Sequence, residues 1–208
     1  MQISLQNKFK DFVKEILNLP VWIKQIIYME LKEQLESSQI ACCMAVTRKE
    51  DCLQLYIPKL TYTGKKELET KTKKLSPEVY SFLESAYQGI SIIETAIKNN
   101  WNLSECSSYF LEAIDNNLLI SPSSEVIKGT ALYMSGRIRL GEYFVKINKI
   151  SIEQLGKALK AQKDMEEERG DRPGLADILI SMNFVSKADT EVILLLKEDC
   201  KKRYSSVS

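Results

Sequence analysis

The chain has 208 residues, of which 44% are hydrophobic and 27% are charged, and its formal net charge is +1. This composition is that of an ordinary globular protein, long enough to bury a hydrophobic core. The small net charge excludes attraction of the whole molecule to nucleic acid or to an anionic membrane, so any such preference must come from a local patch. The chain contains no histidine, which excludes His-based zinc sites, Ser-His-Asp triads and Cys-His dyads.

The cysteines and the apolar runs indicate the compartment. Five cysteines are present, two of them adjacent and none in CxxC spacing, a pattern that argues against a disulfide framework and is typical of a reducing compartment. No apolar run reaches the ~18 residues that a membrane-spanning helix needs. Residues 1–12 are too polar for the apolar region of a signal peptide. We therefore expect a cytoplasmic protein that does not insert into a membrane.

The first 62 residues predict two helices and a small β-hairpin. The helices are expected between residues 7 and 36, with Pro20 opening the second. The apolar stripe from Trp22 to Leu35 fits either packing on its own domain or a homodimer interface. Residues 39–62 contain two β-prone runs, IACCMAV and CLQLYI, separated by the polar turn TRKED, which predicts the hairpin. Its cysteines have no fourth ligand at metal-site spacing, so we expect them to be small hydrophobes.

Residues 76–120 predict three short helices and a strand. Ser76 with Pro77, Ser91 and Ser104 are expected to open the helices, and residues 118–121, LLIS, are expected to form the strand. This order of elements resembles a winged-helix unit. Residues 104–115 contain no Lys or Arg and carry three carboxylates, so phosphate would repel the third helix. Nucleic-acid binding is therefore disfavoured.

One basic cluster qualifies that conclusion. Six lysines lie between Lys59 and Lys74 against two glutamates. A solvated face or loop is one interpretation of the cluster, and an anion-attracting patch is the other. A nucleic-acid-binding protein would have to use these lysines.

The run Ser121-Pro122-Ser123-Ser124 is the clearest boundary signal in the chain. It predicts an α-rich N-terminal module over residues 1–120, a connection over residues 121–135 and a C-terminal domain over residues 136–204. The expected fold class is mainly α, with the small hairpin and the winged-helix-like unit in the first module and a tandem helix-pair repeat in the second.

The tandem repeat is visible when the chain is shifted by 35 residues. The shift aligns Asn148 with Asn183 and Ser151 with Ser186. Asparagine tolerates the left-handed conformation that ends a helix, and each serine is followed three residues later by a Gln or Asp that suits a helix N-terminus. Each copy is therefore expected to be a short helix, a tight turn and a longer helix, with Ile152, Leu155 and Leu159 as the inner stripe of the first long helix.

Three residues of the first copy are not required by this architecture: Arg139, Gly141 and Gln162. Arg139 and Gly141 lie at a helix start, where free N–H groups attract anions. There a glycine admits close approach of a ligand, and an arginine can grip phosphate or a guanine edge. Gln162 shares the leucine stripe, where a buried amide needs a hydrogen-bond partner. The alternative is a surface arginine and a glutamine at the edge of the core.

Residues 139–162, RLGEYFVKINKISIEQLGKALKAQ, resemble the repeat of the N-terminal domain of type II secretion and type IV pilus assembly ATPases. The motif of this MshEN or GspE N-terminal family reads RLGxxLxxxGxxxxxxLxxxLxxQ. The resemblance covers residues 139–199 only. Phe144 replaces a leucine of the motif and Asn148 its second glycine. The motif positions that this chain retains are Arg139, Leu140, Gly141, Leu155, Leu159 and Gln162.

In the MshEN branch, two tandem motifs bind cyclic di-GMP, and other branches dock onto secretion-machinery proteins. The resemblance therefore implies cyclic di-GMP as a ligand, or a bacterial secretion, pilus or signalling protein as a partner. Ligand contacts would come from the retained residues and from Phe144 and Leu175, with Arg172 as a candidate for the arginine role that Gly174 leaves vacant. The second copy also departs from the motif at Ala176, Thr190 and Lys197.

The chain has no GxxxxGK[ST] loop, which excludes a P-loop ATPase motor. No pairing of carboxylates differs from ordinary surface patterning. We therefore expect a non-catalytic bacterial regulatory or adaptor protein. Three hypotheses remain open at this point: a sensor of a cyclic dinucleotide, a protein-contact adaptor without a ligand, and a winged-helix nucleic-acid binder.

Overall fold

The computed structural model describes residues 51–170 and 172–202, and within these ranges the protein is helical, with no strand and one isolated bridge between Leu60 and Leu119. The mainly helical fold class is thus confirmed. The two helices and the β-prone run expected before residue 51 lie outside the described residues. The described elements are η2 (Leu53–Leu55), α4 (Tyr62–Thr70), α5 (Pro77–Tyr87), α6 (Ile92–Asn99), α7 (Leu103–Asp115), α8 (Glu125–Met134), α9 (Leu140–Lys146), α10 (Ile152–Arg169), α11 (Leu175–Ser181) and α12 (Lys187–Asp199).

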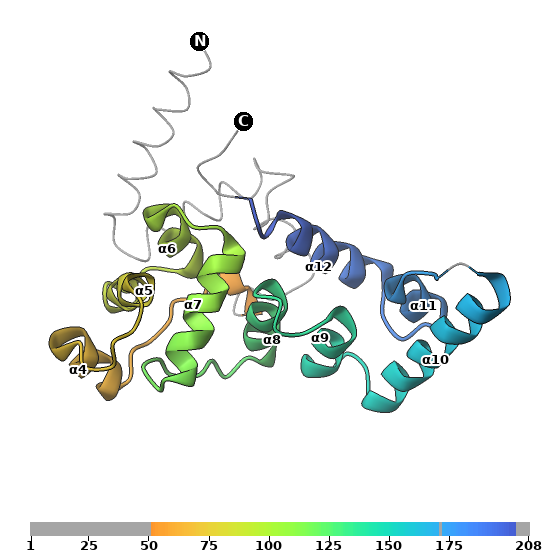
Figure 1. Cartoon of the computed structure of the whole chain (residues 1–208), viewed down its shortest axis with the longest axis horizontal. Coiled ribbons are helices and arrows are strands. Elements are labelled where there is room, and N and C mark those ends of the chain that lie inside the picture. The colour runs from red at the N-terminus through yellow and green to blue at the C-terminus, as the bar shows by residue number, and fades with distance from the viewer. Residues whose placement is uncertain (1–50, 171, 203–208) are drawn as a thin grey trace, which may run out of the picture.

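The helices are arranged in one elongated row. Figure 1 shows α4 to α7 gathered at one end, α8 and α9 in the middle, and α10 and α11 at the other end, with α12 running back toward α7. The return of α12 is fixed by the backbone N–H of Ser104, which donates to the carbonyl of Cys200 at 2.9 Å. One cluster of buried side chains runs through the row, and Phe82, Phe110 and Phe144 are among its largest members.

Side chains cap the helices of residues 76–115 much as the sequence predicts. The hydroxyl of Ser76 accepts from the N–H of Val79, and Ser91 forms a capping box with Glu94. The third helix begins one residue earlier than the predicted start at Ser104. Asn102 is its N-cap, and its side-chain oxygen accepts from the N–H of Glu105 at 2.8 Å. This correction follows from a capping box that satisfies two backbone donors at once.

The predicted hairpin and wing are not formed where the described residues test them. The run at residues 52–57 contains the 3-10 turn η2, and its Leu53 and Gln54 are adjacent and both buried. Leu118 and Leu119, predicted as part of a strand, are likewise adjacent and both buried. Within the described residues the first run makes a 3-10 turn, and the second pairs with Leu60 through a single bridge. The winged-helix interpretation is therefore not supported.

The predicted connection at residues 121–135 contains a full helix, α8. The hydroxyl of Ser124 caps its N-terminus by accepting from the N–H of Ile127. Ile127, Ala131 and Met134 are buried, and α8 packs on both α7 and α9. The segment that the Ser-Pro run marks as a boundary thus carries part of the shared core.

The four helices of the repeat lie where the 35-residue shift predicts them. Asn148 and Asn183 both adopt the left-handed conformation, with φ of 59° and 56°, and end the short helices α9 and α11. Ser151 and Ser186 accept from the N–H of the third residue of α10 and of α12. The local capping pattern therefore determines where each long helix starts.

Candidate functional site

The first predicted site residue, Arg139, is the N-cap of α9 and is exposed. Its backbone N–H donates to the carboxylate of Glu142 at 2.7 Å. Its guanidinium forms no ion pair with another described residue. A carboxylate already occupies the end of the helix that attracts anions, which disfavours a phosphate there.

Gly141 is buried against the protein's own leucines. A Cβ at this position would lie 2.5 Å from Cδ1 of Leu155 and 3.2 Å from Cδ2 of Leu175. The predicted close approach at Gly141 therefore exists, but it serves the packing of α9 on α10 and α11. The structure brings three predicted site residues together here and fills the space between them with their own side chains.

Phe144 was also predicted to contact a ligand, and its burial argues against this prediction. Its side chain is 1% exposed, and its ring packs on Tyr143 with the centroids 5.3 Å apart. A residue enclosed in this way holds α9 in the core and offers almost no surface to a bound molecule.

Gln162 is only 8% exposed, and its Nε2 donates to the carbonyl oxygen of Pro173 at 2.8 Å. Pro173 lies just ahead of α11, so the amide ties the middle of α10 to the start of the second copy. The predicted need of this buried amide for a partner is met by the chain itself. This geometry weakens a role for Gln162 in binding a ligand.

The equivalent residue in the second copy, Lys197, makes a similar link. Its Nζ donates to the carbonyl oxygens of Tyr133 at 2.6 Å and Met134 at 3.0 Å, at the end of α8. It also lies 5.0 Å from the centre of the Tyr133 ring. The equivalent residue of each long helix thus holds a backbone segment that lies just ahead of the other copy: Gln162 holds the segment before α11, and Lys197 holds the end of α8, before α9.

The remaining predicted residues lie at the surface. Arg172 is exposed, and its Nε lies 3.5 Å from the carboxylate of Glu166, which is a weak exposed pair. Leu140 and Leu175 are half-buried, and Leu159 is 45% exposed. The site predicted from the motif is therefore a filled packing contact at Gly141, and its other predicted residues include an exposed leucine and two exposed arginines.

The stripe of α10 that was expected to face the core, Ile152, Leu155 and Leu159, is only partly buried. Ile152 is 73% exposed and Leu159 is 45% exposed, whereas Ala158 and Gln162 are buried. Ala158 and Gln162 are four residues apart, and Gln154, four residues before Ala158, is half-buried. Two of these three side chains are polar, so apolar periodicity does not mark the inner side of α10. We call Ile152, Gly156 and Leu159 the outer face of α10.

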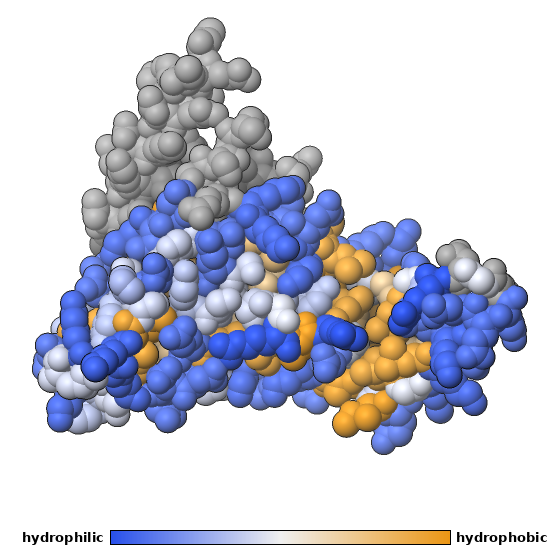
Figure 2. Space-filling model, in the orientation of Figure 1, coloured by the Kyte–Doolittle hydropathy of each residue, from blue (hydrophilic) through white to orange (hydrophobic). Residues whose placement is uncertain are grey.

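Gly156 lies between the two exposed apolar residues of this outer face. No neighbouring atom comes within 4 Å of the place where a Cβ would stand, so the fold itself does not require a glycine there. Figure 2 shows hydrophobic surface gathered between α9 and α10 and around α11. The outer face of α10 contributes its exposed apolar side chains at that end of the molecule.

The second copy provides an internal comparison for the outer face. The 35-residue shift places Lys187, Glu191 and Leu194 of α12 at the equivalent positions. Lys187 and Glu191 form an ion pair at 3.5 Å along an ordinary solvated helix surface. Leu194 is 40% exposed, much like Leu159, so the two copies differ at the other two positions. The repeat fold therefore does not need Ile152 or Gly156, and these two residues of α10 require another explanation.

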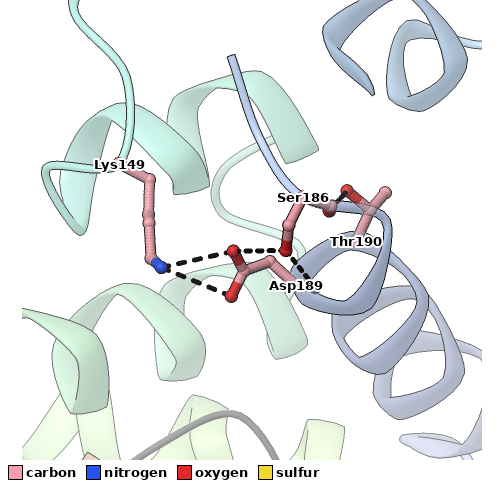
Figure 3. A network of polar contacts seen from close by, with 4 residues as sticks. All are labelled: Lys149, Ser186, Asp189 and Thr190. Carbon is pink, nitrogen blue, oxygen red and sulfur yellow. Dashed lines mark hydrogen bonds and ion pairs between the residues drawn. The ribbon is translucent and has the colours of Figure 1, made fainter. Parts of the chain in front are cut away.

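The two copies also meet through an ion pair, drawn in Figure 3. Nζ of Lys149, in the turn after α9, lies 3.3 Å from both carboxylate oxygens of Asp189 in the first turn of α12. The same carboxylate accepts from the hydroxyl of Ser186 at 2.8 Å. The predicted cap of the second copy thus also holds the turn of the first.

The lysine cluster is mainly an exposed surface around α4. Its two glutamates differ, because Glu69 is exposed whereas Glu67 is buried and accepts from Thr72, Tyr80 and the backbone of Lys73. Nζ of Lys73 donates to the carbonyl of Asn116 at 3.0 Å. Part of the cluster thus stabilises the fold.

Reactive groups are scarce in the part of the chain that the structure describes. No group of three or more His, Cys, Asp or Glu side chains there could hold a metal ion, and none of its helices combines the length and apolar character of a membrane span. Burial raises the pKa of the Cys106 and Cys200 thiols, which disfavours the nucleophilic thiolate.

No family model, curated protein or solved structure matched the chain. The MshEN resemblance therefore depends on the motif residues alone. Their geometry, rather than a relative, has to indicate the function.

Proposed function

We propose that the protein is a non-catalytic adaptor whose C-terminal helix pairs bind another protein through the outer face of α10. The observation that carries the proposal is the 73% exposure of Ile152 together with the 45% exposure of Leu159 on one side of a helix. Apolar side chains at helical spacing are what one helix presents to a partner protein. The charged equivalents Lys187 and Glu191 support this interpretation, because they show that the repeat fold does not need Ile152 or Gly156 at these positions of its long helix.

The resemblance to secretion and pilus ATPases suggests the class of partner. We infer a bacterial secretion, pilus or signalling protein, contacted in the cytoplasm. The links from Gln162 and Lys197 support an adaptor because they hold the two copies as one scaffold, on which an exposed helix face is presented in a fixed orientation.

The test is affinity capture of the tagged full chain from cells of its source, with quantitative mass spectrometry. Replacing Ile152 and Leu159 together by serine is expected to remove the specific partners. Leu194→Ser is the matched control, because Leu194 is the equivalent of Leu159 in α12 and is 40% exposed. Partners that are retained by the double variant, or lost equally in the control, contradict the proposal.

A cyclic dinucleotide such as cyclic di-GMP is the second candidate. It is favoured by the motif resemblance and by the exposed Arg139, whose guanidinium forms no ion pair with another described residue. The engaged amide of Gln162 argues against it. Calorimetry with cyclic di-GMP decides the matter: no heat change with the wild type at high micromolar ligand, or equal binding by Arg139→Ala, excludes this candidate.

A further inference from the structure

We propose that the outer face of α10 binds a second copy of this chain, with the two α10 helices packed antiparallel about a twofold axis at Gly156. The inference rests on the proposed function, because it uses the same face and names its partner. Closed twofold dimers require a face that is complementary to itself. The residues around Gly156 meet this requirement in both their apolar and their charged positions.

The exposed apolar residues are placed almost symmetrically about Gly156. Ile152 lies four residues before Gly156, and Leu159 lies three residues after it. In an antiparallel pair centred on Gly156, Ile152 of one copy lies opposite Leu159 of the other, and the twofold axis repeats this contact. Ile152 of each copy is then covered by Leu159 of the other copy.

The same twofold axis places residues of opposite charge beside each other. Glu153 lies three residues before Gly156, and Lys160 lies four residues after it. Both residues are exposed, and neither forms an ion pair with another described residue. The antiparallel pair places Glu153 of each copy opposite Lys160 of the other, so two ion pairs flank the apolar contact.

Gly156 itself supports a helix crossing at this point. Glycine in a helix interior is less favourable than alanine, and no neighbour in the chain needs the space that its missing side chain leaves. A second helix that crosses there can approach more closely than a side chain would allow. The glycine thus has a role in the pair that it lacks in the single chain.

The second copy of the repeat lacks the isoleucine, the glycine and the charged pair, although its helix α12 exposes Leu194 by 40% and Leu195 by 47%. The residues equivalent to Ile152, Glu153, Gly156 and Lys160 are Lys187, Ala188, Glu191 and Leu195. Each chain therefore presents one self-complementary face of this kind, and one such face leads to a closed dimer and not to a filament.

The test is a charge exchange read by sedimentation equilibrium of the full chain. The wild type is expected to dimerise. Glu153→Lys and Lys160→Glu each create two like-charge contacts in their own homodimer, so each variant alone should dimerise at least about tenfold more weakly. Mixing the two variants restores opposite charges at both contacts, and the mixture is therefore expected to form a heterodimer. Circular dichroism checks that both variants retain the helical content of the wild type.

Two outcomes overturn this inference. A wild type that stays monomeric up to high micromolar concentration excludes the dimer, and a dimer that neither variant weakens must use another surface. Both outcomes leave the affinity capture above as a separate test, because a different protein can still bind the outer face of α10. Loss of captured partners from the Ile152 and Leu159 double variant, combined with a monomeric wild type, would retain the adaptor and reject only the second copy.

Discussion

Gln162 and Lys197 occupy equivalent positions in the two copies of the repeat, and each donates to a backbone carbonyl outside its own helix. Gln162 holds the segment ahead of α11, and Lys197 holds the end of α8, ahead of α9. The long helix of each copy is thus tied to the segment that leads to the other copy. A motif position that the family resemblance assigns to a ligand is here a structural link.

Replacing Gln162 by alanine is expected to destabilise the protein. The change leaves the carbonyl oxygen of Pro173 without its partner, and the expected loss in the free energy of unfolding is about 1–3 kcal/mol. Urea unfolding followed by circular dichroism measures the loss. Arg139→Ala is the control, because an exposed side chain without an ion pair should change stability by no more than about 0.5 kcal/mol. Equal stability of both variants would contradict the structural role of Gln162.

Two glycines are expected to respond to alanine in opposite directions. A Cβ at Gly64 would lie 2.1 Å from the backbone oxygen of Leu118, which cannot move aside as a flexible side chain can. Gly64→Ala should therefore lower the free energy of unfolding by about 2–4 kcal/mol. Gly156 has open space around it, so Gly156→Ala should raise the stability of the monomer by about 0.5–1 kcal/mol. Urea unfolding at low protein concentration compares them. A Gly64→Ala variant as stable as the wild type would contradict the packing around Gly64, and a destabilised Gly156→Ala variant would contradict the open space around Gly156.

Stability at acid pH is expected to depend on Glu67. Burial by itself raises the pKa of this carboxyl, but hydrogen bonds from Tyr80, Lys73 and Thr72 outweigh burial and hold the pKa below its ordinary value of 4.5. A folded-state pKa below the unfolded value stabilises the protein above pH 4.5, and this stabilisation is lost as the pH falls through the folded-state pKa. Glu67→Gln should therefore be less stable than the wild type at neutral pH, and the difference should narrow in acid. Urea unfolding of both proteins, from neutral pH into acid, measures this difference in stability. If the difference does not change with pH, the stability does not depend on the titration of Glu67.

The ion pair between Lys149 and Asp189 is expected to contribute less to the free energy of unfolding than the helix cap that Asp189 forms with Ser186. Lys149 is about half exposed, so Lys149→Met should cost less than about 1 kcal/mol. Asp189→Ala also removes the acceptor of the Ser186 hydroxyl and should cost about 1–2 kcal/mol. A double-mutant cycle separates the two contributions. A coupling energy as large as the whole effect of Asp189→Ala would mean that the ion pair, and not the cap, holds α12.

Structural features that depend on residues close together in the chain could be predicted from the sequence. The serine caps at Ser76, Ser91 and Ser151 and the left-handed turns at Asn148 and Asn183 involve residues within one turn of each other, so each is visible in a short stretch. The same is true of the repeat, because its two copies share these local signals. Helix type and approximate boundaries in residues 76–199 could therefore be predicted.

Features that depend on distant packing could not be predicted in this way. Ile152 and Leu159 have the spacing of a core stripe, yet the arrangement of α9 and α11 buries Ala158 and Gln162 instead. The run at residues 52–57 has the composition of a strand, but its burial on neighbouring helices makes it a turn. The partner of Gln162 lies eleven residues away, at Pro173, and no local rule selects that carbonyl.

The proposed adaptor function requires that a protein cover the outer face of α10. The most direct measurement introduces a photo-reactive amino acid at Lys160, on α10, and in a separate protein at Lys187, on α12, since both are exposed lysines on the long helices of the repeat. After irradiation in cells, the account predicts a discrete cross-linked protein product from position 160 and little or none from position 187. No product from position 160, or equal products from both positions, would contradict it.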